Sequence, residues 1–399
     1  MPALRSKLPE SDEDFSLVLG GPLFQIFRRG YLSGSALELL HRRLIVITAI
    51  SWLPLLFLSL REGYVLSSDI SLPFLRDVDV QTRFLIAQPL LLGAELFVHR
   101  RMVNVARQFL ERGLIPDSDL SRFDRAVASA ARLRNSLVPE LLLIAFVYGI
   151  GVFVLWRKNA EINVSSWYNP TSDGSLHPSL AGWWFALVSL PIFQFLLFRW
   201  YYRLFVWARF LWQVSRIKLD LVPTHPDRAA GLGFLSTVNY AFMPLMLAQG
   251  TLLAGMIANR IFYTGAHLTE FKVDIVVVAA VAVAMVLVPL LVFSPQLGRV
   301  KRVGGREYGK LAQRYVREFD RKWLRGGAAP DELLIGSGDI QSLADMGNSY
   351  QVVREIRWLP FTLKTVLELG VMAIVPVLPL TLTMIPLEQL LDRLLKVLF

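Results

Sequence analysis

The stretch that decides the fold is Val273–Phe293, which reads VDIVVVAAVAVAMVLVPLLVF and contains one ionisable residue, Asp274. A helix needs about 20 mainly apolar residues to cross the hydrocarbon core of a bilayer. Because this stretch has that length and almost no charge, it predicts a membrane-spanning helix. Further apolar runs follow the same pattern at 44–60, 83–98, 137–156, 181–214, 234–258 and 366–385. The sequence therefore predicts an all-α, polytopic helical membrane protein with about seven transmembrane helices and a small helical cytoplasmic layer.

Composition supports this class and excludes several others. Of the 399 residues, 54% are hydrophobic and 19% are charged, and the mean hydropathy is +0.46. Soluble domains contain about a quarter charged residues, so the chain is neither an ordinary soluble protein nor a disordered one. Long continuous apolar runs also exclude an outer-membrane barrel, whose strands alternate apolar and polar residues. Because the chain has no cysteine, it has no disulfide, thiolate metal site, iron–sulfur cluster or cysteine nucleophile.

Lysine and arginine collect in alternate connecting segments, and the net charge is +10. One set of segments holds 31 of these residues and the other set holds 5. The basic set is 1–43, 99–135, 200–230 and 299–358, and the other set is 61–81, 157–180 and 261–273. The positive-inside rule predicts that the basic set, with the N-terminus, is cytoplasmic. Nucleic-acid binding is not predicted, because no soluble stretch is large enough for a standard nucleic-acid module.

The spans and loops divide the chain into four parts. Residues 1–43 form a cytoplasmic tail with an interfacial helix at Ala36–Leu40, and 44–296 form a six-helix transmembrane bundle. That bundle carries a cytoplasmic helical insert at 99–135 and a cytoplasmic turn at 215–230. Residues 297–358 form a basic cytoplasmic helical segment. Residues 359–399 form a proline-broken last transmembrane helix, which crosses fully or re-enters, and an amphipathic helix at Leu387–Phe399.

Ionisable residues within or beside apolar runs are functional hypotheses by default. A group of them is expected at the depth of the inner membrane interface, and it forms a candidate polar vestibule that admits cations or passes protons: Glu95, Glu140, His225, Asp227, Arg228 and Glu368. The alternative is a set of interfacial salt bridges, in which the glutamates pair with Arg100, Arg101, Arg199 or Lys364.

The sharpest polar motif is Thr224-His225-Pro226-Asp227-Arg228. A helix start explains it if Thr224 or His225 caps the helix, Pro226 takes the first helical position and Asp227 lies in the first turn. The alternative is a site at the cytoplasmic mouth that titrates or binds an ion, because histidine and aspartate have the appropriate chemistry.

Two pairs of residues are candidates for lining a path through the bundle. Asn239 and Gln249 lie on roughly the same side of the fifth predicted span, where hydrogen bonding between helices is the alternative role. Pro376 and Pro379 interrupt the last apolar run. Each proline leaves a carbonyl about one turn earlier without its helical partner, and discontinuous membrane helices often form ion sites.

Two arginine pairs mark predicted boundaries of the membrane. Arg42 and Arg43 follow His41, and Arg100 and Arg101 follow His99. We expect these four arginines to contact anionic lipid headgroups, so that the lipid bilayer is the expected partner. The sequence leaves homo-oligomerisation open.

Motifs of soluble enzymes are absent from the sequence. It contains no G-x-x-x-x-G-K-[ST], no G-x-G-x-x-G after a strand, no H-E-x-x-H and no G-x-S-x-G. We therefore predict no catalytic residue, no cofactor and no metal site. An intramembrane enzyme acting on lipids would have only His225, Asp227, Glu95 and Glu140 to use.

Three runs resemble strings that recur in uncharacterised bacterial multi-pass inner-membrane proteins, and the resemblance covers most of the chain. They are Phe15–Leu23 (FSLVLGGPL), His225–Gly233 (HPDRAAGLG) and Ile340–Asp345 (IQSLAD). The resemblance implies a location in the bacterial inner (plasma) membrane. It implies no activity, so no functional residue is carried over from it.

Two functions are consistent with these features. The first is a channel or transporter for small ions or solutes, whose path is lined by the last three spans. The alternative is a membrane-embedded interaction or scaffold protein whose cytoplasmic helices, 100–134 and 299–358, bind a partner. The first requires a polar path through the bundle and the second does not.

Overall fold

The structure is a computed structural model that describes residues 17–18, 20, 40–161, 165–170 and 177–384, with the backbone alone for 150–161. Most of the predicted interfacial helix Ala36–Leu40 and all of the predicted amphipathic helix Leu387–Phe399 lie outside these residues.

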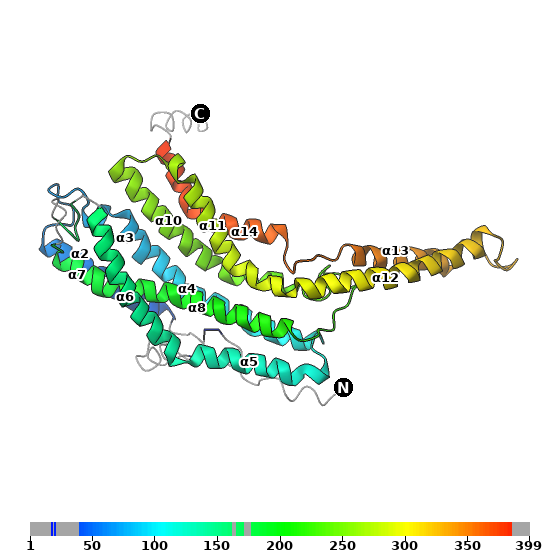
Figure 1. The fold of residues 1–399 in the computed structure, drawn as a ribbon. Coiled ribbons are helices and arrows are strands. Elements are labelled where there is room, and N and C mark those ends of the chain that lie inside the picture. Colours follow the sequence, from blue (N-terminus) through cyan, green and yellow to red (C-terminus); the bar gives the residue numbers. More distant parts are fainter. Residues whose placement is uncertain (1–16, 19, 21–39, 162–164, 171–176, 385–399) are drawn as a thin grey trace.

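The all-α fold predicted from the sequence is confirmed (Figure 1). The α-helices of the described residues are α2 (Leu40–Arg61), α3 (Val78–Thr82), α4 (Gln88–Glu111), α5 (Leu120–Asn135), α6 (Leu137–Glu161), α7 (Leu180–Trp184), α8 (Leu190–Ser215), α9 (Phe234–Val238), α10 (Met243–Thr264), α11 (Lys272–Leu287), α12 (Ser294–Phe319), α13 (Gly338–Arg354) and α14 (Leu363–Ile374).

Short turns of tighter or wider helix join several of these helices into longer rods. The wider π-type turns are η3 (Arg83–Ala87), η5 (Phe185–Ser189) and η9 (Asp320–Leu324). The tighter 3₁₀ turns are η2 (Phe74–Arg76), η4 (Asp117–Asp119), η6 (Asn239–Phe242), η7 (Leu268–Phe271), η8 (Val288–Phe293) and η10 (Val375–Met384). Several of these turns lie next to a proline, which has no N–H for the regular helical ladder.

Among the described residues, five helical rods are long and apolar enough to cross a membrane, which makes this a membrane protein. They are Leu40–Arg61, Leu180–Ser215, Phe234–Thr264, Leu268–Leu324 and Leu363–Met384. The third predicted span corresponds to α6, whose apolar part with described side chains is the shorter segment Leu137–Gly149. The second predicted span corresponds to η3 and the first half of α4, where Arg83, Gln88 and Glu95 interrupt the apolar run.

Prolines inside the rods leave carbonyls that neighbouring helices satisfy. Pro54 cannot donate to the carbonyl of Ile50, and that oxygen accepts a hydrogen bond of 3.3 Å from Trp184 Nε1. Pro191 likewise leaves the carbonyl of Leu187, which accepts a bond of 3.1 Å from the Tyr148 hydroxyl. Inside a bilayer no water is available to donate to these carbonyls. The Trp184 and Tyr148 side chains therefore remove the free-energy cost of leaving each carbonyl unpaired.

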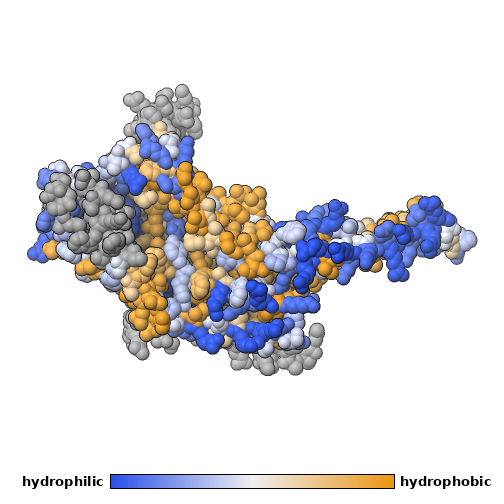
Figure 2. All heavy atoms as spheres, viewed as in Figure 1, coloured by the Kyte–Doolittle hydropathy of each residue, from blue (hydrophilic) through white to orange (hydrophobic). Residues whose placement is uncertain are grey.

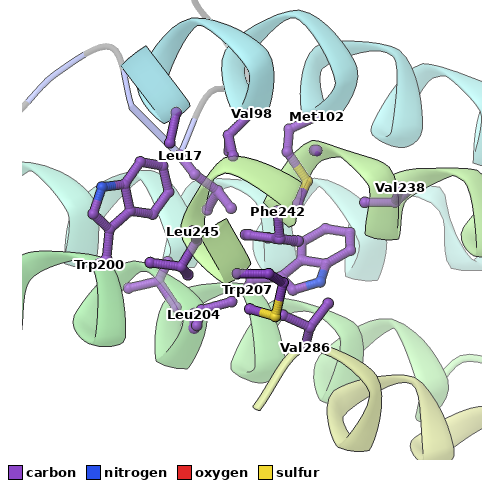
Figure 3. Packing of buried hydrophobic residues seen from close by; sticks show 14 of the residues in the cluster. Leu17, Val98, Met102, Trp200, Leu204, Trp207, Val238, Phe242, Leu245 and Val286 are labelled. Atoms are coloured by element: carbon purple, nitrogen blue, oxygen red, sulfur yellow. The ribbon is translucent and has the colours of Figure 1, made fainter. Parts of the chain in front are cut away.

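The core lies where α4, α8 and α10 pass one another (Figure 3). Trp200 and Trp207 of α8 are 2% and 1% exposed, and they face Val98 and Met102 of α4 across the core. The indole N–H of Trp200 donates to the carbonyl of Leu91 at 2.8 Å. Large aromatic side chains thus fill the space between the rods, and the indole N–H of Trp200 remains paired.

α10 approaches two of its neighbours at glycine. A Cβ on Gly250 would lie 2.1 Å from the carbonyl oxygen of Ala373 and 3.0 Å from Pro376 Cδ in the last rod. A Cβ on Gly255 would lie 2.1 Å from Thr82 Oγ1 in α3. Small residues let membrane helices pack backbone against backbone, so these glycines set the position of α10 between the two neighbours.

The largest feature outside the apolar part is a long arm. The rod that begins with α11 continues through η8 into α12, and α13 folds back along α12 (Figure 1). Figure 2 shows hydrophilic residues over the length of this arm and hydrophobic residues over the bundle next to it. The basic helical segment predicted at 297–358 therefore forms a projecting helical hairpin.

We expect Gly250→Ala to lower the free energy of unfolding by about 1–3 kcal/mol, the usual cost of overpacking a tight contact. The added Cβ would overlap the carbonyl oxygen of Ala373, a backbone atom that cannot move aside alone. Thermal unfolding in detergent, followed by circular dichroism, measures the change. The control is Gly370→Ala on α14, where a Cβ meets nothing within 4 Å; equal melting temperatures for the two variants would contradict the role of Gly250.

Candidate functional site

A buried cluster of charged side chains joins four helices at one end of the bundle. Glu95 of α4 is 2% exposed and accepts hydrogen bonds from three arginines. Arg203 Nη2 lies 2.8 Å and Arg199 Nη1 lies 3.3 Å from Glu95 Oε1, and Arg43 of α2 pairs with Oε2. Each arginine is at most 6% exposed, so the charges are removed from water and depend on one another.

Glu140 of α6 belongs to the same cluster. Its Oε1 lies 3.4 Å from Arg199 Nε, and Glu140 is 8% exposed. Arg199 therefore bridges Glu95 and Glu140, two of the candidate vestibule residues. The arrangement has the form of the salt-bridge alternative, with Arg199 as one of the anticipated partners. The cluster contains three arginines and two glutamates, so its formal charge is positive, which suits an anion better than a cation.

The four predicted headgroup anchors occupy different environments. Arg42 and Arg100 are exposed at the surface. Arg101 is exposed and donates to the carbonyl of Thr237 at 3.1 Å. Arg43 is 1% exposed and pairs with Glu95, so it does not lie at the headgroup surface as expected. Its helix places it one residue beyond Arg42 and thus on the inward side of α2.

The His225–Gly233 run is a tight turn built around the carboxylate of Asp227. Asp227 Oδ1 accepts from the backbone N–H of Ala229 at 2.8 Å and of Gly231 at 3.2 Å, and Oδ2 accepts from the N–H of Gly233 at 2.8 Å. His225 Nδ1 lies 3.0 Å from the same carboxylate. The helix that follows begins at Phe234, so the expectation that Pro226 starts a helix is wrong.

Local backbone geometry explains why this turn is not helical. Arg228 and Ala230 have φ of 54° and 53°, and Gly231 has φ of 100°. Positive φ is costly for residues with a side chain, and Asp227 offsets the cost by satisfying three backbone donors. Partial burial raises the pKa of the Asp227 carboxyl group, but the N–H donors of Ala229, Gly233 and Gly231 and the neighbouring His225 outweigh it, so the pKa lies below its ordinary value.

This turn holds the base of the arm. The Arg357 guanidinium donates to the Asp227 carbonyl at 2.8 Å, and its backbone N–H donates to the Arg228 carbonyl at 2.9 Å. The Arg228 side chain pairs with Glu355 at 3.0 Å. On α12, a Cβ at Gly304 would lie 2.7 Å from Pro223. We call residues 223–233 the clamp turn, because α12 and the segment that follows α13 both contact it.

The vestibule candidates therefore divide into separate groups. Glu95 and Glu140 meet through Arg199, whereas the partners of His225, Asp227 and Arg228 are clamp-turn and arm residues. Glu368 of α14 forms a third site, where it accepts from the Tyr240 hydroxyl and lies 3.8 Å from Lys364 Nζ. Within the described residues, each of these groups therefore has its own set of hydrogen-bond and ion-pair partners.

The candidate path-lining residues contact neighbouring helices. Gln249 Nε2 donates to the Tyr201 hydroxyl of α8 at 2.6 Å. Asn239 is 2% exposed. Pro376 lies against Gly250 of α10, and Pro379 falls within the 3₁₀ turn η10, whose shorter hydrogen-bonding pattern accommodates the break. The placements of Gln249 and Pro376 match the alternative role of hydrogen bonding and packing between helices, whereas Asn239 Nδ2 is buried without a hydrogen-bond partner among the described residues.

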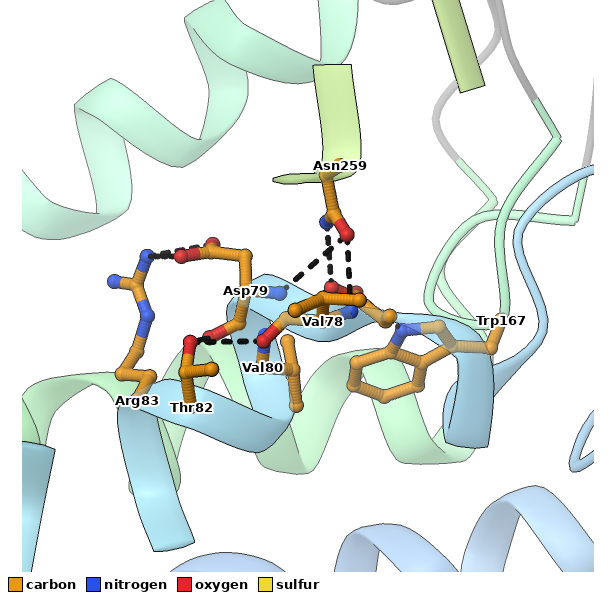
Figure 4. Close-up of polar contacts among 8 residues, drawn as sticks. Val78, Asp79, Val80, Thr82, Arg83, Trp167 and Asn259 are labelled. Atoms are coloured by element: carbon orange, nitrogen blue, oxygen red, sulfur yellow. Dashed lines mark hydrogen bonds and ion pairs between the residues drawn. The ribbon is translucent and has the colours of Figure 1, made fainter. Parts of the chain in front are cut away.

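A second polar network fixes the opposite end of the bundle, and the sequence analysis missed it (Figure 4). The Asp77 carboxylate is 2% exposed and accepts from Trp167 Nε1 at 2.9 Å and from Asn259 Nδ2 at 2.8 Å. Asn259 Oδ1 in turn accepts from the backbone N–H of Val78 at 2.9 Å. Burial, followed by the nearby Asp79, raises the pKa of Asp77 above its ordinary value. This network ties a loop, α3 and α10 together.

Sequence reasoning also missed Arg203, although a signal was present. Arg199 and Arg203 are four residues apart and so lie on one face of α8. Two arginines on one face of an apolar helix require acidic partners inside the bundle. Which acidic residues become these partners depends on how the helices pack, and the sequence alone does not show that.

Comparisons with known proteins add no assignment. No family model matches the chain, and no curated protein and no solved structure shows significant similarity to it. Within the described residues, no group of three or more His, Asp or Glu side chains is placed to hold a metal ion.

We expect Asp227→Asn to destabilise the clamp turn by about 1–3 kcal/mol at pH 7, the cost of losing hydrogen bonds to a charged acceptor. Because the pKa of Asp227 is lowered by folding, its stabilising effect is complete above the unfolded pKa of about 3.9 and is lost as pH falls below it. Melting of both proteins in detergent from pH 7 to pH 3 tests this. The difference should shrink at the acid end; a constant difference would contradict the role of the charge.

Proposed function

We propose that the chain is a membrane-embedded interaction protein whose α12–α13 arm binds a protein partner on the cytoplasmic side of a bacterial inner membrane. The observation that carries the proposal is the tip of the arm. It exposes four large apolar side chains in a segment that is otherwise polar: Leu324 at 72%, Leu333 at 77%, Leu334 at 44% and Ile335 at 91%.

Exposed apolar side chains of this kind need an explanation. Leu333, Leu334 and Ile335 are consecutive, and a run of three exposed apolar residues is unfavourable in water unless it serves a function. Patches with a polar rim mark interaction sites, and charged residues surround this one, including Lys322, Glu332 and Asp339. We infer that a protein surface covers the tip.

The arm is rigid enough to present its tip. α12 has 26 residues, which corresponds to about 39 Å of helix. Near the tip, Lys322 pairs with Glu332 and with Asp339, at 2.8 Å for the latter, and Trp323 Nε1 donates to Asp339 at 2.9 Å. Proximity to Lys322 and Trp323 lowers the pKa of Asp339, so these bonds hold a charged carboxylate near neutral pH.

The base of the arm is equally well fixed. The clamp turn holds it through Arg357 and Arg228, and Lys301 Nζ donates to the Ile356 carbonyl at 2.6 Å. Hydrogen bonds and an ion pair therefore join the arm to the bundle, rather than a flexible linker. A movement of the tip would move its base against the bundle as well. This supports an interaction module that is mechanically connected to the membrane part.

The geometry gives less support to transport. Gln249 and Pro376 contact neighbouring helices, and Glu95 and Glu140 are each bonded to arginine. Ion or solute flux through vesicles containing the purified protein, under any gradient, would favour the channel or transporter over the interaction protein.

A photo-crosslinking amino acid at Ile335 should give a discrete protein adduct in intact cells, because this side chain is the most exposed of the four. The matched control is the same amino acid at Arg314 on α12, whose side chain is 79% exposed and pairs only along its own helix surface. Adding Leu333→Asp should reduce the Ile335 adduct by at least about tenfold, as expected for a central interface residue.

The adduct is identified by mass. A mass of two chains would show that the partner is a second copy, and a different protein mass would show a separate partner; either supports the proposal. Equal labelling at the two positions, or only lipid at Ile335, would contradict it.

The orientation has a separate test. Since the chain has no cysteine, a single Ile335→Cys variant reports one position. The proposal predicts that a membrane-impermeant maleimide labels it only after the cells are opened, because the basic segment 299–358 is not readily translocated. Labelling in intact spheroplasts would reverse the orientation.

A further inference from the structure

One face of the arm carries a straight line of basic side chains, which we call the basic stripe. Its members are Arg299, Arg306, Lys310 and Arg317 of α12, and Arg321 of the η9 turn that follows. The intervals between them are seven, four, seven and four residues, which places them on one side of a helix with 3.6 residues per turn. From the first residue to the last, the stripe is about 33 Å long.

The basic stripe lies on the side of α12 that faces away from α13. Contacts with the α13 side of the hairpin come from the opposite face of α12. There, Lys301 Nζ donates to the Ile356 carbonyl at 2.6 Å, and the Tyr315 hydroxyl donates to the Asp339 carbonyl at 3.3 Å. All members of the stripe are exposed, so neither α13 nor the bundle covers it within the described residues.

The acidic residues of α12 and η9 do not neutralise the stripe. Residues 299–325 contain ten Lys or Arg and three Asp or Glu. Two of these acids pair with arginines outside the stripe: Glu318 with Arg314 and Asp320 with Arg325, each at 3.1 Å. Within the part of the chain that the structure describes, no member of the stripe forms an ion pair. The stripe is therefore an uncompensated positive surface.

The spacing of the stripe is unfavourable for the arm by itself. Arg306 and Lys310 are like charges four residues apart, and so are Arg317 and Arg321. Such pairs face each other on a helix and destabilise it. A negatively charged partner along the stripe would replace this repulsion with attraction.

Length and direction exclude the membrane surface as that partner. Arg317 follows Phe293, the end of the predicted span, by 24 residues, which corresponds to about 36 Å of helix. Figures 1 and 2 show the arm extending away from the hydrophobic surface of the bundle. The potential of charged headgroups decays over about 8 Å at physiological salt, so it does not reach the outer half of the stripe.

Two other anionic or symmetric partners fit less well than an acidic protein. A nucleic acid would match the charge of the stripe but would leave the apolar residues 333–335 at the tip uncovered. A second copy would bring the same stripe and a net charge of +10, so the two arms would repel each other.

We propose that the arm binds a separate, acidic protein, whose carboxylates lie along the basic stripe while an apolar part of the same protein covers the tip. The inference rests on the proposed function, because it assigns the chemistry of the partner that the arm binds. The stripe ends at Arg321, three residues before Leu324 of the apolar tip, so the two surfaces adjoin. Complementary charge then selects the partner and speeds encounter, and the apolar tip anchors it.

The photo-crosslinked adduct at Ile335 measures the contribution of the stripe. Arg317→Gln/Arg321→Gln should reduce this adduct in intact cells by about tenfold. Because the change removes a like-charge pair, it does not destabilise the helix. The matched control is Arg314→Gln/Arg325→Gln, which changes the net charge equally at arginines that are already paired with acids, and it should leave the adduct unchanged.

Salt and nuclease distinguish the class of partner. In permeabilised cells, a rise from about 0.1 M to about 1 M salt shortens the Debye length from about 10 Å to about 3 Å. The wild-type adduct should therefore weaken more than the adduct of Arg317→Gln/Arg321→Gln. Loss of the adduct after nuclease treatment would show that a nucleic acid occupies the stripe, and it would overturn the inference.

The outcomes separate this inference from the proposed function. Equal adducts from the two double variants, or an adduct with the mass of two chains, would overturn the acidic partner and leave the proposed function in place. Absence of any protein adduct at Ile335 in the otherwise unchanged chain would contradict both. Arg314, the control position for crosslinking, lies at the edge of the stripe and is paired with Glu318, so its labelling should stay below that of Ile335.

Discussion

The arrangement of the bundle depends on one carboxylate. Glu95 is buried in α4 and bonds to arginines from α2 and α8, and Arg199 extends the contact to Glu140 on α6. Removing one partner of such a buried pair typically costs about 3–5 kcal/mol, because the remaining charge is left without compensation. The four helices therefore cannot slide or rotate independently.

Contacts between helices satisfy the backbone carbonyls that prolines leave without a helical partner. Prolines interrupt several rods, and the carbonyls of Ile50 and Leu187 are satisfied by Trp184 and Tyr148 from neighbouring helices. Where the last rod breaks at Pro376, it packs directly on Gly250. The polar residues within the apolar region thus act in assembly, which is consistent with a protein whose interactions take place at its surfaces.

The two surfaces that remain are at different places and have different chemistry. The arm presents apolar side chains to a polar environment, and the outside of the bundle presents an apolar groove between α2, α6 and α8. The clamp turn connects the arm to the bundle, since it fixes the base of the arm through Arg228 and Arg357 and precedes the α9–α10 rod. Under the proposed function, this layout would hold a protein partner at a fixed distance from the membrane part.

The sequence alone determined the class of the protein. Long apolar runs specify membrane helices because the bilayer acts on each segment separately, and the all-α prediction needed no long-range information. The projecting hairpin was anticipated only as a basic helical segment. For the candidate site residues, only an approximate depth was predictable, together with Arg199 as one of four alternative partners of the glutamates.

Their partners depended on tertiary structure. Arg43 and Glu95 are 52 positions apart, and Glu95 and Arg199 are 104 apart. The side of α2 on which Arg43 lies determines whether its guanidinium contacts a lipid headgroup or a buried carboxylate. Likewise, Asp227 follows a proline and resembles a helix-start acid, yet its carboxylate closes a turn with positive φ, and Arg357, 130 positions away, bonds to that turn. Local physics sets where a segment lies in the membrane, whereas charge pairing depends on which helix faces become neighbours, and only packing of the whole chain decides that.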